Sequence, residues 1–403
     1  MTQLPPASTT PKHVQYLRVL ALGFCAFIFN TSEFVPVGLL SDISEDFGIT
    51  PSQTGWMLTI YAWIVGVMSL PMMLITSRME RKLLLMGTCT VFIVSHGLST
   101  IAWDFQSLMI SRIGVAFSHA VFWSITASIA IRVAPPGKMN FALSVLATGT
   151  GMAMVLGVPL GRLIGQHLGW RMAFEVIGLA ALVITALVFR LLPPLPSLTS
   201  TNLTAKVKSV FTNKRLFIMY LSVFLVFTAH YGTYSYIEPF LMDFGGVSSN
   251  LTTVILLTFG VSGIIGSTLF SYLGERYGAQ LMIGSAVGMA LCMLCLAIAL
   301  SSETALIVIT VVWGAALILT CLAMQSRVLS IDTSASDIIM SLFSGIINMG
   351  IGAGALLGSI SIEQVGLGNI GYVASVVAFL AIWVVIYIAR MNIKPVAVSG
   401  GGH

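Results

Sequence analysis

An acidic residue within a long apolar stretch is the first candidate for chemistry in this sequence. Glu33 lies inside Leu17–Leu40, a stretch long enough to cross a bilayer. A carboxylate at membrane depth costs roughly 2.5–3.5 kcal/mol on insertion scales, so such residues usually face the inside of a helix bundle. Asn30 lies one turn earlier on about the same helical face. Glu33 is therefore a candidate proton acceptor or a hydrogen-bonding group for the hydroxyls of a polar ligand. The alternative is a carboxylate near the end of the span that water reaches.

A second titratable group, His119, lies in the apolar stretch 106–131. Arg112 precedes it by seven residues, or two helical turns, and Trp123 follows one turn later, so the three share a face. Histidine has an unperturbed pKa of about 6.5, which suits proton exchange between compartments of different pH. We expect Glu33, His119 and Arg112 to couple transport to protons. A lone buried histidine can also be purely structural, and Arg112 could reach water at the membrane boundary.

Polar aromatic residues crowd the stretch 216–242, and we expect them to line a binding site. Tyrosine rings can pack on the C–H face of a sugar while their hydroxyls bond its polar edge. Tyrosines also form a belt at membrane interfaces, which is the alternative reading for the outer end of this stretch. The substrate-binding candidates, including those in other stretches, are Asn30, Tyr61, Trp123, His230, Tyr231, Tyr234, Glu238, Ser344 and Asn348.

Composition and apolar runs predict an all-α membrane protein. The 403 residues are 57% hydrophobic and only 8% charged, with a mean hydropathy of +0.98. A soluble chain of this length needs far more charge on its surface. Apolar runs of about 20 residues, the length that spans a bilayer, recur twelve times. They cover 17–40, 54–77, 83–103, 106–131, 141–165, 171–192, 216–242, 250–273, 279–300, 303–326, 338–362 and 368–389.

Basic residues predict the orientation of these spans. Sixteen of the 19 Lys and Arg residues fall on one side when the spans are threaded alternately, and the positive-inside rule then makes both termini cytoplasmic. The net charge of +5 follows from this topology and gives no reason to expect nucleic-acid binding. The sixteen are Lys12, Arg18, Arg78, Arg81, Lys82, Arg132, Lys138, Arg190, Lys206, Lys208, Lys214, Arg215, Arg276, Arg327, Arg390 and Lys394.

The chain divides into two related halves. We expect a six-helix bundle over 1–192, a cytoplasmic linker over 193–215 and a second six-helix bundle over 216–403. A shift of 197 residues aligns Asp46-Phe47-Gly48 with Asp243-Phe244-Gly245, and it places His230 on Glu33. Two parallel halves of this kind put a substrate site near the bilayer midplane, between them.

At this point two motifs carry a family resemblance. The loop with Arg78 and Arg81 resembles the signature between helices 2 and 3 of the major facilitator superfamily, although Ser77 stands where that signature has an aspartate. Gly157, Pro159 and Gly161 are similar to the helix-5 motif of the drug:proton antiporter-1 family, although the proline comes one residue late.

Further segments, FIFNTSEFVPVGLLSDI and SRIGVAFSHAVFWSITASIAIR, resemble bacterial sugar efflux transporters of that family. The resemblance implies a major facilitator fold of two pseudo-symmetric bundles that exports arabinose-like sugars and galactoside analogues by proton antiport. We also expect a monomer in the bacterial inner membrane. The expected partners are a sugar, protons and the lipid bilayer, without a cofactor or metal.

Three other readings stay open from the sequence. A multidrug:proton antiporter that exports lipophilic or cationic compounds would use Glu33 and the aromatic residues equally well. Proton-coupled uptake is the second, because the sequence gives no thermodynamic direction. The third is a membrane-embedded enzyme, and the sequence offers it no bis-histidine haem pattern, nucleotide loop or Ser/His/Asp arrangement.

Overall fold

The computed structural model describes residues 11–197, 210–331 and 336–390. Lys206, Lys208 and Lys394, which contribute to the predicted charge asymmetry, lie outside these residues. Twelve helices of this part of the chain are long and apolar enough to cross a membrane, which confirms the predicted number of spans. The spans run over Lys12–Gly38, Pro51–Arg78, Arg81–Thr100, Phe105–Val133, Phe141–Leu168, Trp170–Leu191, Lys214–Tyr234, Ser249–Gly274, Arg276–Ala299, Glu303–Ile331, Ile338–Val365 and Leu367–Arg390.

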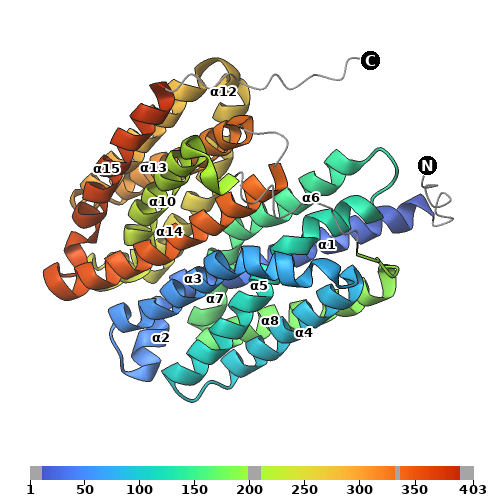
Figure 1. The fold of residues 1–403 in the computed structure, drawn as a ribbon. Helices are drawn as coiled ribbons and strands as arrows, with labels where there is room; N and C mark the ends of the chain where they lie inside the picture. The colour runs from blue at the N-terminus through green and yellow to red at the C-terminus, as the bar shows by residue number, and fades with distance from the viewer. Residues whose placement is uncertain (1–10, 198–209, 332–335, 391–403) are drawn as a thin grey trace.

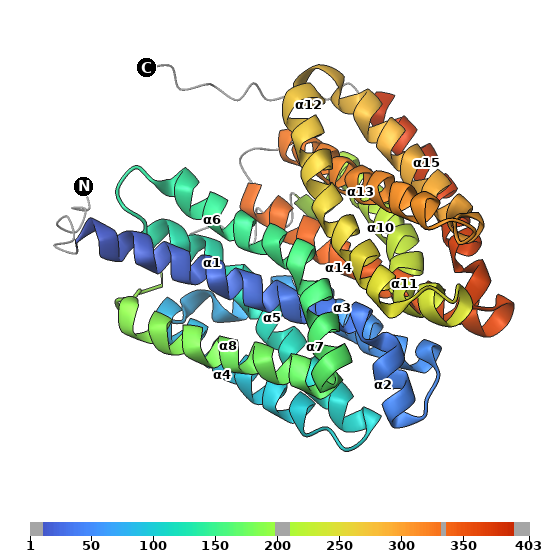
Figure 2. The ribbon, with the colours of Figure 1, turned by 180° about the vertical axis from the view of Figure 1, so that it is seen from behind.

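The spans form two bundles of six, which meet along a shared face (Figures 1 and 2). The helices of the first are α1 (Lys12–Phe34), α3 (Pro51–Ile75), α4 (Arg81–Thr100), α5 (Phe105–Val133), α6 (Met139–Met152) with α7 (Val158–Leu168), and α8 (Trp170–Leu191). Those of the second are α10 (Lys214–Tyr234), α12 (Ser249–Ala299), α13 (Glu303–Ile331), α14 (Ser336–Val365) and α15 (Ile370–Arg390). The long α12 contributes two spans because its backbone leaves helical geometry at Tyr277.

Two helices that carry candidate residues end earlier than the apolar runs suggest. α1 ends at Phe34 and continues as a 3₁₀ turn, Val35–Gly38, that contains Pro36. Glu33 therefore lies in the last turn of α1 and not at its middle. The apolar run 216–242 is not one helix, because α10 ends at Tyr234 and is followed by the short α11 (Ile237–Pro239) and a π-helical turn. Hydropathy does not register such breaks, since the residues in them are as apolar as the helix.

The fifth span carries the predicted glycine–proline segment and is not a regular helix. A π-helical turn, Ala153–Gly157, joins α6 to α7, and Pro159 lies in the first turn of α7. A Cβ on Gly157 would come within 3.2 Å of the Thr31 Cα, and one on Gly161 would come within 2.6 Å of a Val35 methyl group. The absence of side chains at these positions lets the fifth span pack closely on the first, where Glu33 lies.

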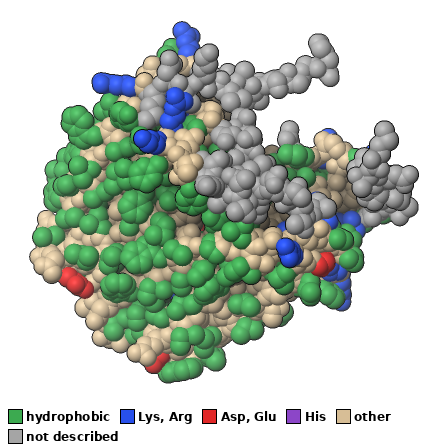
Figure 3. Space-filling model, in the orientation of Figure 1, with side chains coloured by type: hydrophobic (Ala, Val, Ile, Leu, Met, Phe, Trp, Pro, Cys, Tyr) green, Lys and Arg blue, Asp and Glu red, His purple; other side chains and the backbone are tan. Residues whose placement is uncertain are grey.

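The two bundles converge at one end and diverge toward the end where α1 begins and α15 ends (Figures 1 and 2). We call the latter the basic side and the other the acidic side. Figure 3 shows Lys and Arg side chains along the basic side, where an acidic side chain also lies, further acidic side chains toward the other side, and a broad hydrophobic surface between them. Between the bundles, α3 packs on α14, and α7 packs on α12.

Candidate functional site

Glu33, His119 and Tyr61 come together on the inner face of the first bundle. Glu33 Oε2 lies 3.5 Å from His119 Nε2, and the Tyr61 hydroxyl lies 2.9 Å from His119 Nδ1. All three side chains are buried. The pair of Glu33 and His119 can hold one proton on either partner. An imidazolium donates from Nδ1 to the Tyr61 oxygen, whereas a neutral imidazole with its hydrogen on Nε2 accepts from the Tyr61 hydroxyl at Nδ1.

Arg112 is packed against this group and is not at a water boundary. Its side chain is only 1% exposed, and its guanidinium lies 4.5 Å from the centre of the Tyr61 ring. Nη1 donates to the Ser32 hydroxyl over 3.4 Å, whereas Nε and Nη2 have no partner among the described residues. Arg112 also lies within electrostatic range of Glu33. The structure thus brings the three predicted proton-coupling residues together in one buried group.

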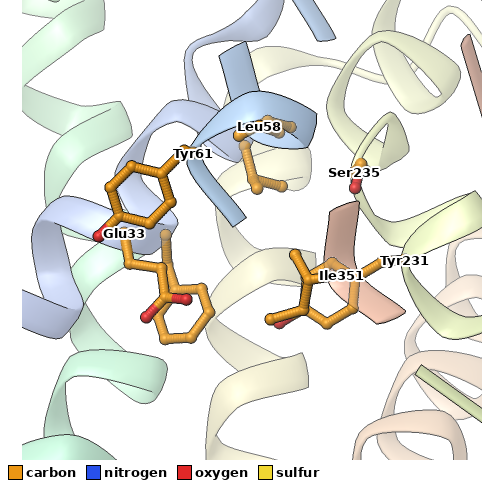
Figure 4. A pocket seen from close by; sticks show the side chains of 8 residues that line it. Glu33, Leu58, Tyr61, Tyr231, Ser235 and Ile351 are labelled. Carbon is orange, nitrogen blue, oxygen red and sulfur yellow. The ribbon is translucent and has the colours of Figure 1, made fainter. Parts of the chain in front are cut away.

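A small pocket lies between the bundles at this group (Figure 4). The first bundle contributes a carboxylate, a phenol and apolar side chains, and the second contributes a tyrosine, a serine and an isoleucine. The lining residues are Glu33, Phe34, Val37, Leu58, Tyr61, Tyr231, Ser235 and Ile351. The carboxylate of Glu33 is therefore placed where a molecule held by both bundles would meet it.

Ser235 is a lining residue that the sequence analysis missed. Its hydroxyl is buried and has no hydrogen-bond partner within the part of the chain that is described. An unpartnered buried hydroxyl is costly, so it favours a polar ligand or water at that position. The only sequence signal was its place two residues beyond Thr233 in a segment of polar aromatic residues.

The other substrate-binding candidates in the first bundle lie around the pocket without lining it. Asn30 donates to the backbone oxygen of Ala26 on its own helix and approaches Thr150 over 3.5 Å. Trp123 is half-buried, with its ring 6.2 Å from that of His119.

On α14, Asn348 is buried and donates to the backbone oxygen of Ser344, whose side chain is exposed. Its Oδ1 atom has no partner among the residues described. These two predicted residues are close in sequence to Ile351, which lines the pocket.

His230 and Tyr234 point into the second bundle and not toward Glu33. The His230 ring stacks on Tyr234 and on Phe259, at centroid distances of 5.0 and 5.6 Å, and meets Trp313 edge-on at 5.4 Å. Of the predicted group on α10, only Tyr231 reaches the pocket.

Glu238 takes part in an ion pair that links the two bundles on the acidic side. Arg162 Nη1 lies 2.7 Å from Glu238 Oε1 and 2.9 Å from the backbone oxygen of Gly38, and both charged side chains are fully buried. Glu238 Oε2 accepts the Ser41 backbone N–H over 3.0 Å, and Arg162 also donates to Ser249. We call Arg162, Glu238, Ser41 and Ser249 the latch.

Two further carboxyl groups, Asp42 and Asp243, lie next to the latch. Burial raises the pKa of both groups above the ordinary aspartate value, and the nearby positive charge of Arg162 only partly opposes this. Asp42 Oδ2 is buried without a hydrogen-bond partner in the described ranges, and Asp243 accepts from the Ser41 hydroxyl over 3.3 Å. A second polar contact joins the bundles, because Ser52 donates to Glu363 over 2.6 Å.

The loop after α3 is held by backbone oxygens. Arg81 donates to the Thr76 and Ser77 backbone oxygens over 3.0 Å each, so the residue that departs from the signature still accepts through its main chain. Arg78 ends the 3₁₀ turn of this loop. Partial burial raises the pKa of Glu80, but backbone N–H donors, among them that of Leu195, outweigh it and lower the pKa below the usual value.

Comparison with known proteins decides the family, because residues 22–331 match the Major Facilitator Superfamily. The chain belongs to the major facilitator superfamily. It is a multi-pass membrane transporter, and the two-bundle architecture is the fold of that superfamily.

Two similar structures are of a bacterial homologue of the human lysosomal transporter Spinster, in inward-facing unoccupied and inward-facing occupied conformations. They have TM-scores of 0.71 and sequence identities of 14% and 16%. They cover 94% and 95% of this chain and 98% of their own. These identities support the shared fold alone.

Proposed function

We propose that this transporter is a proton-coupled exporter of sugars that works by alternating access. The observation that carries the proposal is the buried pair of Glu33 and His119 at the wall of a pocket between the bundles. A carboxyl group that exchanges its proton in such a place makes substrate binding and proton binding sensitive to one another.

A sugar suits the chemistry of the lining. The pocket presents the phenols of Tyr61 and Tyr231, the hydroxyl of Ser235 and the carboxylate of Glu33, and its apolar side chains suit the C–H face of a pyranose. The resemblance of the sequence to bacterial sugar efflux transporters of the drug:proton antiporter-1 family supports arabinose-like sugars and galactoside analogues as substrates.

The arrangement of contacts supports an inward-facing state. The latch and the bond between Ser52 and Glu363 tie the bundles together on the acidic side, and the bundles diverge on the basic side. By the positive-inside rule the basic side is cytoplasmic, with both termini on it, and the acidic side faces out. The similar structures of the Spinster homologue are also inward-facing.

The transport cycle follows from these elements. In the inward-facing state Glu33 or His119 releases a proton to the cytoplasm and the pocket takes up a sugar. The bundles then rock, the latch breaks, and the pocket opens outward. Proton return to the pair from the more acidic exterior favours release of the sugar, so the inward proton gradient drives the export. We place the protein in the bacterial inner membrane as a monomer.

The test is uptake into inside-out vesicles that carry the protein, with a pH gradient that is acidic inside. We expect gradient-dependent accumulation of a labelled arabinose or galactoside analogue, and its collapse when a protonophore is added. Accumulation that is equal with and without the gradient would overturn proton coupling.

A second candidate is proton-coupled export of lipophilic cations. The observation that favours it is the apolar part of the lining, Phe34, Val37, Leu58 and Ile351, beside a carboxylate. Competition in the same vesicles separates the two functions, because displacement of the labelled sugar by other sugars supports the first, whereas transport of cationic dyes without sugar competition supports the second.

A further inference from the structure

A further buried histidine, His96, is connected to Arg112 through Ser32 and has no part in the transport cycle above. It lies on α4 and is fully buried. Its Nδ1 atom lies 3.0 Å from the backbone oxygen of Phe92, and its Nε2 atom lies 2.9 Å from the hydroxyl of Ser32. Ser32 precedes Glu33 on α1, and its hydroxyl is the group to which Arg112 donates.

The partners of His96 fix the direction of these hydrogen bonds. The carbonyl of Phe92 can only accept, so Nδ1 of His96 carries a hydrogen. In a neutral imidazole Nε2 then has only a lone pair, and the Ser32 hydroxyl must donate to it. This orientation leaves the lone pairs of the Ser32 oxygen for the guanidinium of Arg112. The result is a series of two hydrogen bonds that run in one direction: Arg112 donates to Ser32, and Ser32 donates to His96.

The surroundings of His96 favour its neutral form. The groups packed on it are Ser32 of α1, Arg112 beyond that hydroxyl on α5, and Phe174 and Gly178 of α8. No carboxylate is among these contacts, and a proton on His96 would add a second positive charge beside Arg112. A Cβ on Gly178 would come within 3.0 Å of the His96 Cβ, so the imidazole occupies a place that the neighbouring helix leaves free.

Arg112 depends on this chain for its position. Its only hydrogen bond among the described residues goes to Ser32, and its other contacts are the faces of the Tyr61 and Phe174 rings. Ring faces attract a cation but do not fix its direction as a hydrogen bond does. Without an oriented Ser32 oxygen, the guanidinium loses the one directional contact that holds it near Glu33.

We propose that His96 is a positioning residue, which orients the Ser32 hydroxyl so that it holds Arg112 beside Glu33. The inference rests on the proposed function, in which Glu33 takes up and releases the transported proton. His96 itself holds no transported proton in this account. Its role is to keep the positive charge of Arg112 at a constant place relative to the carboxyl group.

The test follows the protonation of Glu33 directly by infrared difference spectroscopy of purified protein over a pH series. The carboxyl band of Glu33 is assigned by its loss in Glu33→Gln. Three variants are compared with the wild type: His96→Leu, which removes the acceptor; His96→Gln, whose amide can accept from Ser32 near the place of Nε2; and Ser32→Ala. Neither a substrate nor transport is needed.

We expect the midpoint of the Glu33 titration to rise in His96→Leu by on the order of half a pH unit, because a positive charge moves away from the carboxylate. Ser32→Ala should give a similar rise, the double variant no further rise, and His96→Gln a midpoint near that of the wild type. This pattern distinguishes positioning from packing, because a purely structural role would lower thermal stability and leave the midpoint unchanged.

An unchanged midpoint in a folded His96→Leu protein would overturn the proposal, and so would additive shifts in the double variant. If His96→Leu does not fold, His96→Gln and Ser32→Ala still decide the matter through the same midpoints. A wild-type protein with no Glu33 band at any pH would overturn it as well, since Arg112 would have no titrating charge to act on. A wild type that titrates but does not export sugar would refute the proposed function and leave the positioning role intact.

Discussion

The latch offers the sharpest perturbation of the conformational cycle. Glu238→Gln keeps the size of the side chain but removes its charge, so the buried guanidinium of Arg162 loses its ion-pair partner and keeps only the more distant carboxyl groups of Asp42 and Asp243 nearby. Both side chains are at most 1% exposed when the latch is formed. When the bundles part on the acidic side, Arg162 reaches water and the penalty disappears. The substitution should therefore act on the outward-closed state alone.

The size of the effect follows from this burial. Removal of one partner from a buried ion pair costs about 3–5 kcal/mol. Because each 1.4 kcal/mol is a factor of ten, the ratio of outward-closed to outward-open molecules should fall roughly 10²- to 10³-fold or more. The ion pair of Arg171 and Asp46 is a matched control: it has the same N–O distance of 2.7 Å, but its side chains are 35% and 40% exposed and it lies within the first bundle. Loss of such an exposed pair costs only about 0.2–1 kcal/mol.

Distances between spin labels on the acidic side measure this ratio. Labels at His167 and Ser301, which are exposed residues in different bundles, are introduced after the five native cysteines have been replaced. We expect the wild type to populate mainly the short distance, Glu238→Gln to add a longer one, and Asp46→Asn to resemble the wild type. The double variant Glu238→Gln with Arg162→Met should return toward the short distance, because no buried charge is left unpaired.

Identical distance distributions for Glu238→Gln and the wild type would refute this reasoning. An equal response to Asp46→Asn would also refute it, because the effect would then come from surface charge and not from a buried pair.

Three further predictions concern the same interface and pocket. Burial raises the pKa of Asp42 and Asp243 when the latch is closed, so closure of the latch takes up protons. The short distance between the spin labels should therefore gain population as the pH falls from about 7 toward about 5. The opposite trend would contradict a link between these two carboxyl groups and closure. A Cβ on Gly55 would collide with the Tyr236 ring of the other bundle, so Gly55→Ala should populate the longer distance, whereas Gly87→Ala, whose Cβ meets nothing within 4 Å, should not. Ser235→Ala should weaken sugar binding about 2- to 10-fold, because one hydrogen bond to the sugar is lost. Calorimetry measures this affinity, and an unchanged value would show that the hydroxyl does not bind the sugar.

The sequence was sufficient for the number of spans and for the grouping of Glu33, His119 and Arg112. Apolar runs of about 20 residues are a strong signal because every span must match the same bilayer thickness. The two-turn spacing of Arg112 and His119 placed both on one face, and the structure brings that face against Glu33. Helical periodicity determines such neighbours within one helix.

Contacts between helices were harder to predict. The pairing of Arg162 with Glu238 joins two bundles, and no pattern within either helix tells which side chains will face each other across an interface. The repeat placed His230 on Glu33, but it relates positions of the backbone only, and Phe259 and Trp313 surround His230 in the second bundle. His96 was missed because it is one polar residue in an apolar run, and its meaning depends on Ser32 of another helix.

The central claim is that Glu33 exchanges the proton that drives transport at the pocket between the bundles. Its most direct measurement compares Glu33→Gln with the wild type in two assays on the same inside-out vesicles: accumulation of labelled sugar under a pH gradient, and exchange of labelled for unlabelled sugar without a gradient. The account predicts that the variant loses accumulation and keeps exchange, since the pocket still binds sugar and the bundles still rock. Gradient-driven accumulation at the wild-type level in Glu33→Gln would contradict it.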